Sequence, residues 1–347
     1  MKALVINQIT SLSENRNPLV LIDLAKPSPI DNEILIEVYA CGICHTEIDE
    51  IEGRAKPPVL PVIPGHQVAG KVVEKGNSVQ KFKIGDMVGV GWIYSACGKC
   101  DFCKKGLENL CADFKATGLD ANGGYAEYMK IKEDFAVHIP ESLQKEILHV
   151  APLLCAGAIG YRSLWLSKIQ NNNTLGLSGF GGSAHLVLKM ARYQFPDTKI
   201  YVFARSEVER KFSLELGADW AGDFEDTPPE MLDSIIDTTP VWTPILKSMK
   251  NLKPGGRLII NAIRKEEVDK KSLLKLDYPS HLWMEKEIKS VANVTRFDIE
   301  ECLRLSAMAG IKPEIQAFKL EEANRALLEL KERKIRGSKV LIIKDRS

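Results

Sequence analysis

The sequence predicts a two-domain protein that joins a β-rich, barrel-type domain to an α/β domain with a doubly wound parallel sheet. The chain has 347 residues, which suits two domains of about 100 to 200 residues each. Residues 1 to 150 contain short strand-like segments separated by glycine and proline, whereas buried apolar runs alternate with helical periodicity from residue 154 onwards. The second pattern indicates βαβ units around a sheet covered on both faces.

The β-rich part has its clearest strand-like segments at 34–40, 68–76 and 86–94. The first residues, MKALVINQI, also alternate like a strand and lack the basic, apolar and cleavage regions of a signal peptide. No uncharged apolar run reaches the roughly 18 residues that a membrane-spanning helix needs. We therefore expect a cytoplasmic protein.

In the α/β part, each apolar run predicts a strand and the stretch after it a helix. The predicted strands are 174–179, 199–204, 234–239 and 256–263. Two further helical stretches, 298–310 and 320–337, precede an apolar strand at 339–343 that is placed to return to the first domain. The charge run at 265–271 is interpreted as a solvated surface loop.

The charge balance is nearly neutral, with 47 basic and 46 acidic side chains and a formal net charge of +1. Such a chain has no excess positive charge to bind a nucleic-acid backbone or an anionic bilayer. Neither nucleic acid nor membrane is expected as a partner.

Cysteine usage indicates metal binding. Eight cysteines are too few for a disulfide scaffold, and six of them lie between positions 41 and 111. Four form the pattern C-x2-C-x2-C-x7-C, which lets a short lobe wrap four thiolates around one tetrahedral zinc ion without an open position. This predicts a structural zinc site, with a four-cysteine iron–sulfur cluster as the alternative. Its ligands are Cys97, Cys100, Cys103 and Cys111.

A catalytic metal site needs three protein ligands, an open position and supporting hydrogen bonds. Cys44, His66 and Cys155 are the candidates. Each alone is weak evidence, because a single buried cysteine is usually a small apolar residue.

A family resemblance gives these residues their context. Segments along almost the whole chain, in the family's order, resemble the zinc-dependent alcohol dehydrogenases of the medium-chain dehydrogenase/reductase superfamily: CGICHTEIDE (41–50), GHQVAGKVVEKGNSVQKFKIGDMV (65–88), the four-cysteine lobe, GGYAEY (123–128), APLLCAG (151–157) and SGFGGSAH (178–185). The resemblance implies a GroES-like barrel catalytic domain over 1–153 and 294–347, a Rossmann domain over 154–293, and a catalytic zinc in the cleft.

The resemblance also implies roles for the residues near that zinc. Cys44, His66 and Cys155 take its three ligand positions and leave the fourth for water or substrate. Thr46 matches the hydroxyl that accepts the alcohol proton, and Glu47 matches the carboxylate that receives the free imidazole N–H. Trp92 resembles an aromatic residue of the substrate pocket, with a core position as the alternative.

The chain departs from the family pattern at two places in this region. Asp49 stands where many members have the histidine that ends the proton relay, and Gln67 replaces the glutamate of the usual GHE motif. A carboxylate or water is then expected to complete the relay, and less negative charge is available near the zinc. Cys41 and Cys302 match no ligand position and are interpreted as packing residues.

The expected cofactor loop is a G-x-G-x-x-A version of the dinucleotide fingerprint between a strand and a helix. It comprises Gly179, Phe180, Gly181, Gly182, Ser183 and Ala184. The next strand ends at Ala204 without a carboxylate, and Arg205, Ser206 and Arg210 follow, so we expect NADP(H) to be preferred over NAD(H). The alternative is that Arg205 points to solvent and either cofactor is used. By resemblance, His45 approaches the pyrophosphate; a surface position is its alternative.

The leading hypothesis is a zinc-dependent oxidoreductase with two zinc ions per chain, which transfers a hydride between a small primary alcohol or aldehyde and NADP(H). The alternatives are oxidation of a polyol or amino alcohol, reduction of an activated C=C bond, and an inactive zinc-stabilised nucleotide-binding protein. The resemblance further implies a homo-oligomer, either a dimer or a tetramer.

Overall fold

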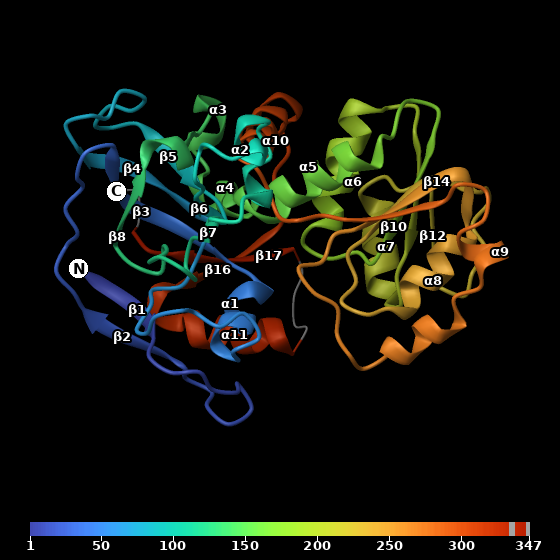
Figure 1. Cartoon of the computed structure of the whole chain (residues 1–347), viewed down its shortest axis with the longest axis horizontal. Coiled ribbons are helices and arrows are strands. Elements are labelled where there is room, and N and C mark those ends of the chain that lie inside the picture. The colour runs from blue at the N-terminus through green and yellow to red at the C-terminus, as the bar shows by residue number, and fades with distance from the viewer. Residues whose placement is uncertain (333–336, 345–347) are drawn as a thin grey trace. The chain divides into compact units, whose positions relative to one another are not determined.

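The computed structural model describes residues 1–332 and 337–344. The chain divides into two compact units, one of Met1–Ala158 with Val294–Ser347 and one of Ile159–Asn293. Segments from both ends of the chain build the first unit, as the blue and red elements in Figure 1 show. The end of the predicted helix at 320–337 includes residues 333–336, which lie outside the described residues.

A mixed sheet forms the framework of the first unit. Within the described residues it has seven strands in the order β16-β17-β3-β4-β5-β9, with β8 paired to β3. The strands are β3 (Glu33–Ile43), β4 (Val68–Lys75), β5 (Met87–Val90), β8 (Tyr128–Lys132), β9 (Val137–His138), β16 (Ile315–Lys319) and β17 (Ser338–Ile342). Two smaller sheets pair β1 (Lys2–Ile6) with β2 (Leu19–Asp23), and β6 (Ile93–Ser95) with β7 (Lys115–Ala116).

Strand β17, near the C-terminus, joins the sheet that the N-terminal part of the chain begins. It runs antiparallel to β3, with Lys339 opposite Ile43, and parallel to β16. The predicted return of the 339–343 segment to the first domain is therefore confirmed. The predicted strand at 86–94 is instead divided into β5 and β6, because its two halves pair in different sheets: β5 pairs with β4 and β9, whereas β6 pairs with β7.

Helices and 3-10 turns flank this framework. They are α1 (His45–Ile51), α2 (Asp101–Lys104), α3 (Glu141–Gln144), α4 (Ile147–Val150), α10 (Arg296–Ala309) and α11 (Ala323–Lys331), with 3-10 turns η1 (Glu108–Leu110), η2 (Glu133–Phe135), η3 (Ala151–Leu154) and η5 (Leu320–Glu322). Helix α10 is capped at both ends. The Thr295 side chain accepts a hydrogen bond from the backbone N–H of Asp298 at its start, and Gly310 ends it with φ +61°.

The second unit contains a parallel sheet of six described strands in the order β12-β11-β10-β13-β14-β15. The strands are β10 (Thr174–Ser178), β11 (Lys199–Phe203), β12 (Trp220–Gly222), β13 (Leu232–Asp237), β14 (Leu252–Ile260) and β15 (Glu287–Ser290). The helices are α5 (Ala156–Ser167), which begins just before the unit, α6 (Ala184–Gln194), α7 (Glu207–Glu215), α8 (Thr243–Lys250) and α9 (Tyr278–His281), with the 3-10 turn η4 (Lys270–Lys275). This order is that of a Rossmann sheet and confirms the predicted doubly wound architecture.

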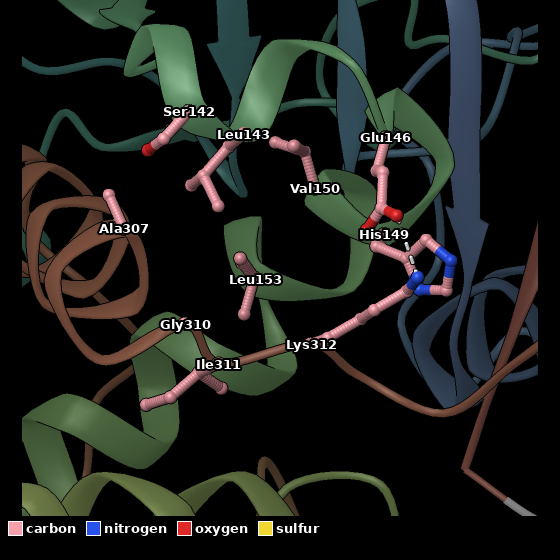
Figure 2. A pocket seen from close by; sticks show the side chains of 10 residues that line it. All are labelled: Ser142, Leu143, Glu146, His149, Val150, Leu153, Ala307, Gly310, Ile311 and Lys312. Carbon is pink, nitrogen blue, oxygen red and sulfur yellow. Dashed lines mark hydrogen bonds and ion pairs between the residues drawn. The ribbon is translucent and has the colours of Figure 1, made fainter.

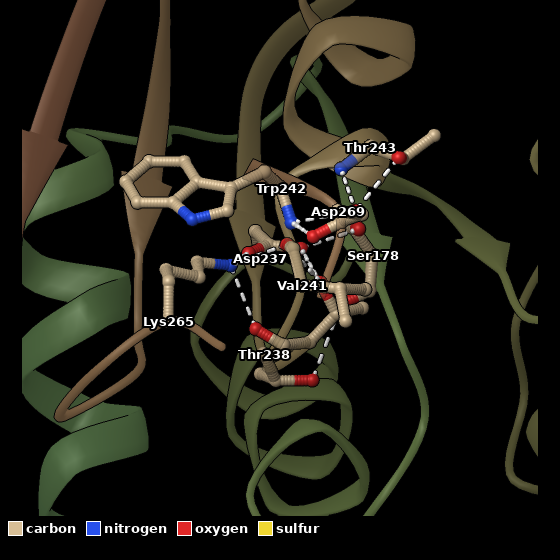
Figure 3. Close-up of polar contacts among 9 residues, drawn as sticks. Ser178, Asp237, Thr238, Val241, Trp242, Thr243, Lys265 and Asp269 are labelled. Carbon is tan, nitrogen blue, oxygen red and sulfur yellow. Dashed lines mark hydrogen bonds and ion pairs between the residues drawn. The ribbon is translucent and has the colours of Figure 1, made fainter. Parts of the chain in front are cut away.

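The prediction that 265–271 is only a solvated loop is wrong at its first residue. The Lys265 side chain is 5% exposed and forms an ion pair with the fully buried Asp237 (Figure 3). Asp269 of the same run accepts hydrogen bonds from the backbone N–H groups of Trp242 and Thr243. Charge patterning missed these contacts because it does not register partners that are distant in sequence.

Among the described residues, no single helix has the length and apolar character to cross a membrane. One pair of helical segments, Ile147–Leu154 and Ala156–Ser167, has the required length and apolar composition only when the two segments are counted together, and the chain bends by 45° between them.

Candidate active site and metal centres

Helix α1 positions the first group of candidate residues. Cys44 precedes the helix in an extended conformation, with φ −131° and ψ 166°. Its backbone N–H donates to Oε2 of Glu47 at 2.7 Å, which satisfies one of the free donors at the start of the helix. The same contact holds the Glu47 carboxylate against the backbone of Cys44.

His66 enters the site from the loop before β4. The preceding Gly65 has φ +97°, and a Cβ there would lie 2.3 Å from the Tyr125 ring, so only glycine fits. Nδ1 of the buried His66 lies 2.7 Å from Oε1 of Glu47, and its ring meets the Trp92 ring edge-on at 4.8 Å. Its other nitrogen, Nε2, lies 3.3 Å from Sγ of Cys155.

The three predicted ligands of the catalytic zinc therefore come together. The ligand atoms of Cys44, His66 and Cys155 all lie within 4.8 Å of one another. Two thiolates and one imidazole are a donor set that suits zinc and leaves a fourth position for another ligand. A hydrogen bond with the Cys155 thiol lowers the pKa of Cys44 well below its usual range, which favours a thiolate at this position.

Three neighbours on α1 differ in their surroundings. Thr46 is buried, and its hydroxyl oxygen lies 3.5 Å from Sγ of Cys44. His45 is exposed. The buried Asp49 accepts a hydrogen bond from Nε of Arg54 at 2.5 Å, so the residue at the usual relay histidine position is part of an ion pair.

Glu50 on the same helix carries a fully buried carboxyl group that the motifs did not point to. Neither carboxyl oxygen has a hydrogen-bond partner among the described residues. Burial, and then the charge of Glu47, raise the pKa of Glu50 well above its ordinary value. The signal was the three-residue spacing from Glu47, which places both carboxyl groups on one side of a helix.

The four-cysteine lobe forms a second cluster. The sulfur atoms of Cys97, Cys100, Cys103 and Cys111 all lie within 4.8 Å of one another. The backbone N–H groups of Lys99 and Cys100 lower the pKa of Cys97 to about 6. Four thiolates around one position match a tetrahedral structural metal site.

The glycine-rich segment in the second unit lies between β10 and α6. Gly179 follows the strand with φ +82°, where other residues would be strained. Around Gly181, a Cβ would meet nothing within 4 Å, so the backbone is open to a close ligand. Phe180 is buried, Gly182 continues the turn, and Ser183 and Ala184 begin the helix. This is the arrangement that holds a pyrophosphate at a helix N-terminus.

The turn after β11 carries the predicted selectivity residues. Ala204 is buried, whereas Arg205 and Ser206 are exposed at the carboxyl end of the strand. Nη1 of Arg210 donates to the carbonyl oxygens of Ala204 and Arg205 at 2.7 and 2.9 Å. Arg210 therefore shapes the turn, while the Arg205 side chain is accessible to a ligand.

A cavity of about 180 Å³ in the first unit lies among α3, α4 and α10. Leu143, Leu153 and Ile311 contribute apolar side chains, and the Glu146–Lys312 ion pair lies on one side (Figure 2). None of its lining residues belongs to the predicted metal, cofactor or substrate set.

Comparison with known proteins places this arrangement in a family. Residues 30–141 match the alcohol dehydrogenase GroES-like domain. The chain is 39% identical over 331 residues to "Probable alcohol dehydrogenase AdhA" of Mycobacterium tuberculosis (strain CDC 1551 / Oshkosh), covering 94% of this chain and 93% of that one. It is 30% identical over 354 residues to an alcohol dehydrogenase of Geobacillus stearothermophilus, covering 99% and 100%.

Solved structures of similar fold include two members that cover almost the whole chain. The CAD of Helicobacter pylori, in complex with NADP(H), superposes with a TM-score of 0.85 at 28% identity and covers 98% of this chain and 97% of that one. A cinnamyl alcohol dehydrogenase of Sorghum bicolor gives a TM-score of 0.82 at 27% identity, with the same coverage.

Fold and relatives together define a two-domain alcohol oxidoreductase built from GroES-like and Rossmann domains. The chain belongs to the zinc-dependent alcohol dehydrogenases of the medium-chain dehydrogenase/reductase superfamily, and it is an NAD(P)-dependent alcohol dehydrogenase.

Proposed function

We propose that this enzyme transfers a hydride between a small primary alcohol or aldehyde and NADP(H) at a zinc site formed by Cys44, His66 and Cys155. The convergence of these three ligand atoms within 4.8 Å is the observation that carries the proposal. When bound, zinc supplies a Lewis acid that lowers the pKa of a coordinated alcohol.

Glu47 orients the histidine ligand in this proposal. Its Oε1 accepts the Nδ1 proton of His66, which leaves Nε2 with a free lone pair toward the metal. Its Oε2 accepts the Cys44 N–H, so one carboxylate holds two of the three ligand residues.

Thr46 and Trp92 act on the substrate side. The Thr46 hydroxyl lies beside Cys44 and accepts the proton of the bound alcohol. Trp92 covers the His66 ring and excludes water from that side. The proton then leaves Thr46 through the Asp49 carboxylate, which Arg54 holds in an ion pair, or through water.

A second zinc in the four-cysteine lobe is structural, with all four positions taken by Cys97, Cys100, Cys103 and Cys111. Both clusters require reduced thiols, so we expect the enzyme to act in the cytoplasm. The enzyme acts as a homo-oligomer, a dimer or a tetramer, as the family resemblance implies.

The cofactor proposal combines the open loop at Gly181 with the exposed Arg205 and Ser206. A guanidinium and a hydroxyl at this position bind a 2′-phosphate, and no carboxylate at the end of β11 repels it. His45, exposed at the start of α1, is proposed to contact the pyrophosphate. The Helicobacter pylori structure, which holds NADP(H), supports the same preference.

The experiment is an initial-rate assay with a panel of small aldehydes, using NADPH and NADH on protein of known zinc content. We expect turnover, about two zinc ions per chain and a preference for NADPH. Faster turnover of polyols or amino alcohols would reassign the substrate. Reduction of an activated C=C bond with no aldehyde turnover would reassign the reaction. No turnover of any substrate at full zinc content would contradict the proposed activity.

A further inference from the structure

The side chain of Lys265, just beyond the carboxyl end of β14, is only 5% exposed, whereas Glu267, Lys270 and Lys271 of the same charge run are exposed. Its Nζ pairs with Oδ2 of Asp237 (Figure 3) and donates to the carbonyl oxygens of Thr239 at 2.7 Å and Val241 at 3.1 Å. All three donor positions of the ammonium group are therefore used inside the second unit.

Asp237 is the last residue of β13 and is fully buried. Its Oδ1 accepts hydrogen bonds from the hydroxyls of Ser178 at 2.7 Å and Thr239 at 2.8 Å. Burial raises the pKa of Asp237, and the Lys265 charge acts against that rise. Removing the lysine would leave a buried carboxylate without a counter-charge, which is strongly unfavourable.

This network reaches the glycine-rich loop directly. Ser178 is the residue before Gly179, and its carbonyl oxygen accepts the backbone N–H of Thr238 at 2.8 Å. A Cβ at Gly179 would lie 2.9 Å from Oγ1 of Thr238 and 3.0 Å from Cγ2 of Thr239. The turn that Lys265 holds is thus packed against the first glycine of the fingerprint.

A second contact joins the same strand ends to the helix after the loop. The backbone N–H of Asn261 donates to the Asp237 carbonyl at 2.7 Å, and its Nδ2 donates to Oγ of Ser183 at 3.2 Å. Ser183 precedes α6, where a pyrophosphate would bind. The carboxyl edges of β10, β13 and β14 are therefore linked around one buried ion pair.

We propose that Lys265 is a positioning residue for the dinucleotide: by neutralising Asp237 and tethering the turn at 238–241, it holds the 179–184 loop ready for the pyrophosphate. This inference rests on the proposed role of that loop in cofactor binding. Because NADPH and NADH share the pyrophosphate, the effect is on both cofactors alike, unlike the effect of Arg205.

The test measures the dissociation constants of NADPH and NADH by nucleotide fluorescence, together with thermal stability and kcat. Lys265→Met is expected to weaken both cofactors about 10- to 100-fold, with a much smaller change in kcat at saturating cofactor. Lys270→Met is the matched control, because Lys270 lies five positions on and pairs only at the surface with Glu267 among the described residues. Unchanged dissociation constants with a lowered melting temperature would overturn the proposal.

Should Lys265→Met fail to fold, the double variant Asp237→Asn/Lys265→Met removes both charges and keeps the inference testable. We expect it to recover stability and still bind both cofactors at least 10-fold more weakly, because the carbonyl tether is missing. Wild-type affinity in the double variant would overturn the positioning role. A wild-type protein that binds neither cofactor would instead contradict the proposed function.

Discussion

Glu47 Oε1 and His66 Nδ1 lie 2.7 Å apart in a fully buried contact. In our proposal the carboxylate holds the Nδ1 proton, which leaves Nε2, 3.3 Å from Sγ of Cys155, as the nitrogen that would bind the metal. The ligand set is therefore oriented by a residue that does not bind the metal in our proposal.

Glu47→Gln tests this orientation. The amide keeps the size of the side chain but loses the charge that favours the Nδ1 proton, so we expect zinc affinity at this site to fall about 10- to 100-fold. Competition with a chromophoric chelator measures the affinity. Glu50→Gln is the matched control, since Glu50 is equally buried on α1 but makes no hydrogen bond among the described residues. An equal loss in both variants would show that the contact with His66 is not the cause.

Thr46 is expected to affect proton transfer rather than metal binding. Thr46→Ala should lower kcat about 10²- to 10⁴-fold, while Thr46→Ser, which keeps the hydroxyl, should retain most activity. Steady-state rates and zinc content measured on the same preparations test this. If the alanine variant is as active as the serine variant, the hydroxyl has no role in the reaction.

Arg205→Ala is expected to reduce cofactor selectivity. A charge-assisted hydrogen bond to the 2′-phosphate contributes about 1.5–3 kcal/mol, so the NADPH-to-NADH ratio of kcat/KM should fall about 10- to 100-fold. NADH kinetics in the same variant provide the internal control and should be nearly unchanged. A constant ratio would mean that Arg205 does not contact the phosphate.

Glu52 gives a pH-dependent stability prediction. Its carboxylate accepts from the Leu12 N–H at 3.0 Å and from Lys331 at 2.5 Å, and it pairs with Arg54. Burial opposes the charge, but these contacts lower the pKa of Glu52 from 4.5 to about 2. The stabilisation is therefore complete above pH 4.5 and is lost as the pH falls toward 2.

We expect Glu52→Gln to lower the free energy of unfolding by about 1–3 kcal/mol at pH 7 and by less at pH 3. Urea unfolding of both proteins at the two pH values measures the difference. Glu146→Gln, which alters an exposed ion pair with Lys312, should change stability little at either pH. A loss at pH 3 as large as at pH 7 would rule out the carboxylate charge as its source.

Regular periodicity predicted most of the fold. The alternation of apolar runs and amphipathic stretches after residue 154 corresponds to the parallel sheet and its helices, because this pattern depends only on local spacing. The division of 86–94 into two strands follows instead from their partners, because β5 pairs with β4 and β9 while β6 pairs with β7. No local signal within 86–94 reports which strand each half pairs with.

The candidate site was also predicted only in part from the sequence. Cysteine spacing and family motifs identified the residues of both thiol clusters, but the pairing of Asp49 with Arg54 and the burial of Lys265 were missed. Charged residues are usually solvated, and only the folded chain shows which ones are enclosed. Glu50 was missed for the same reason.

The most direct test of the account is the zinc content and turnover of Cys155→Ser, with Cys103→Ser as the matched change in the four-cysteine lobe. We predict that Cys155→Ser retains about one zinc per chain, loses turnover and keeps most of its thermal stability. Cys103→Ser should also lose one zinc but chiefly lose stability, because a structural metal contributes folding energy. Two zinc ions and full turnover in Cys155→Ser would contradict the proposed catalytic site.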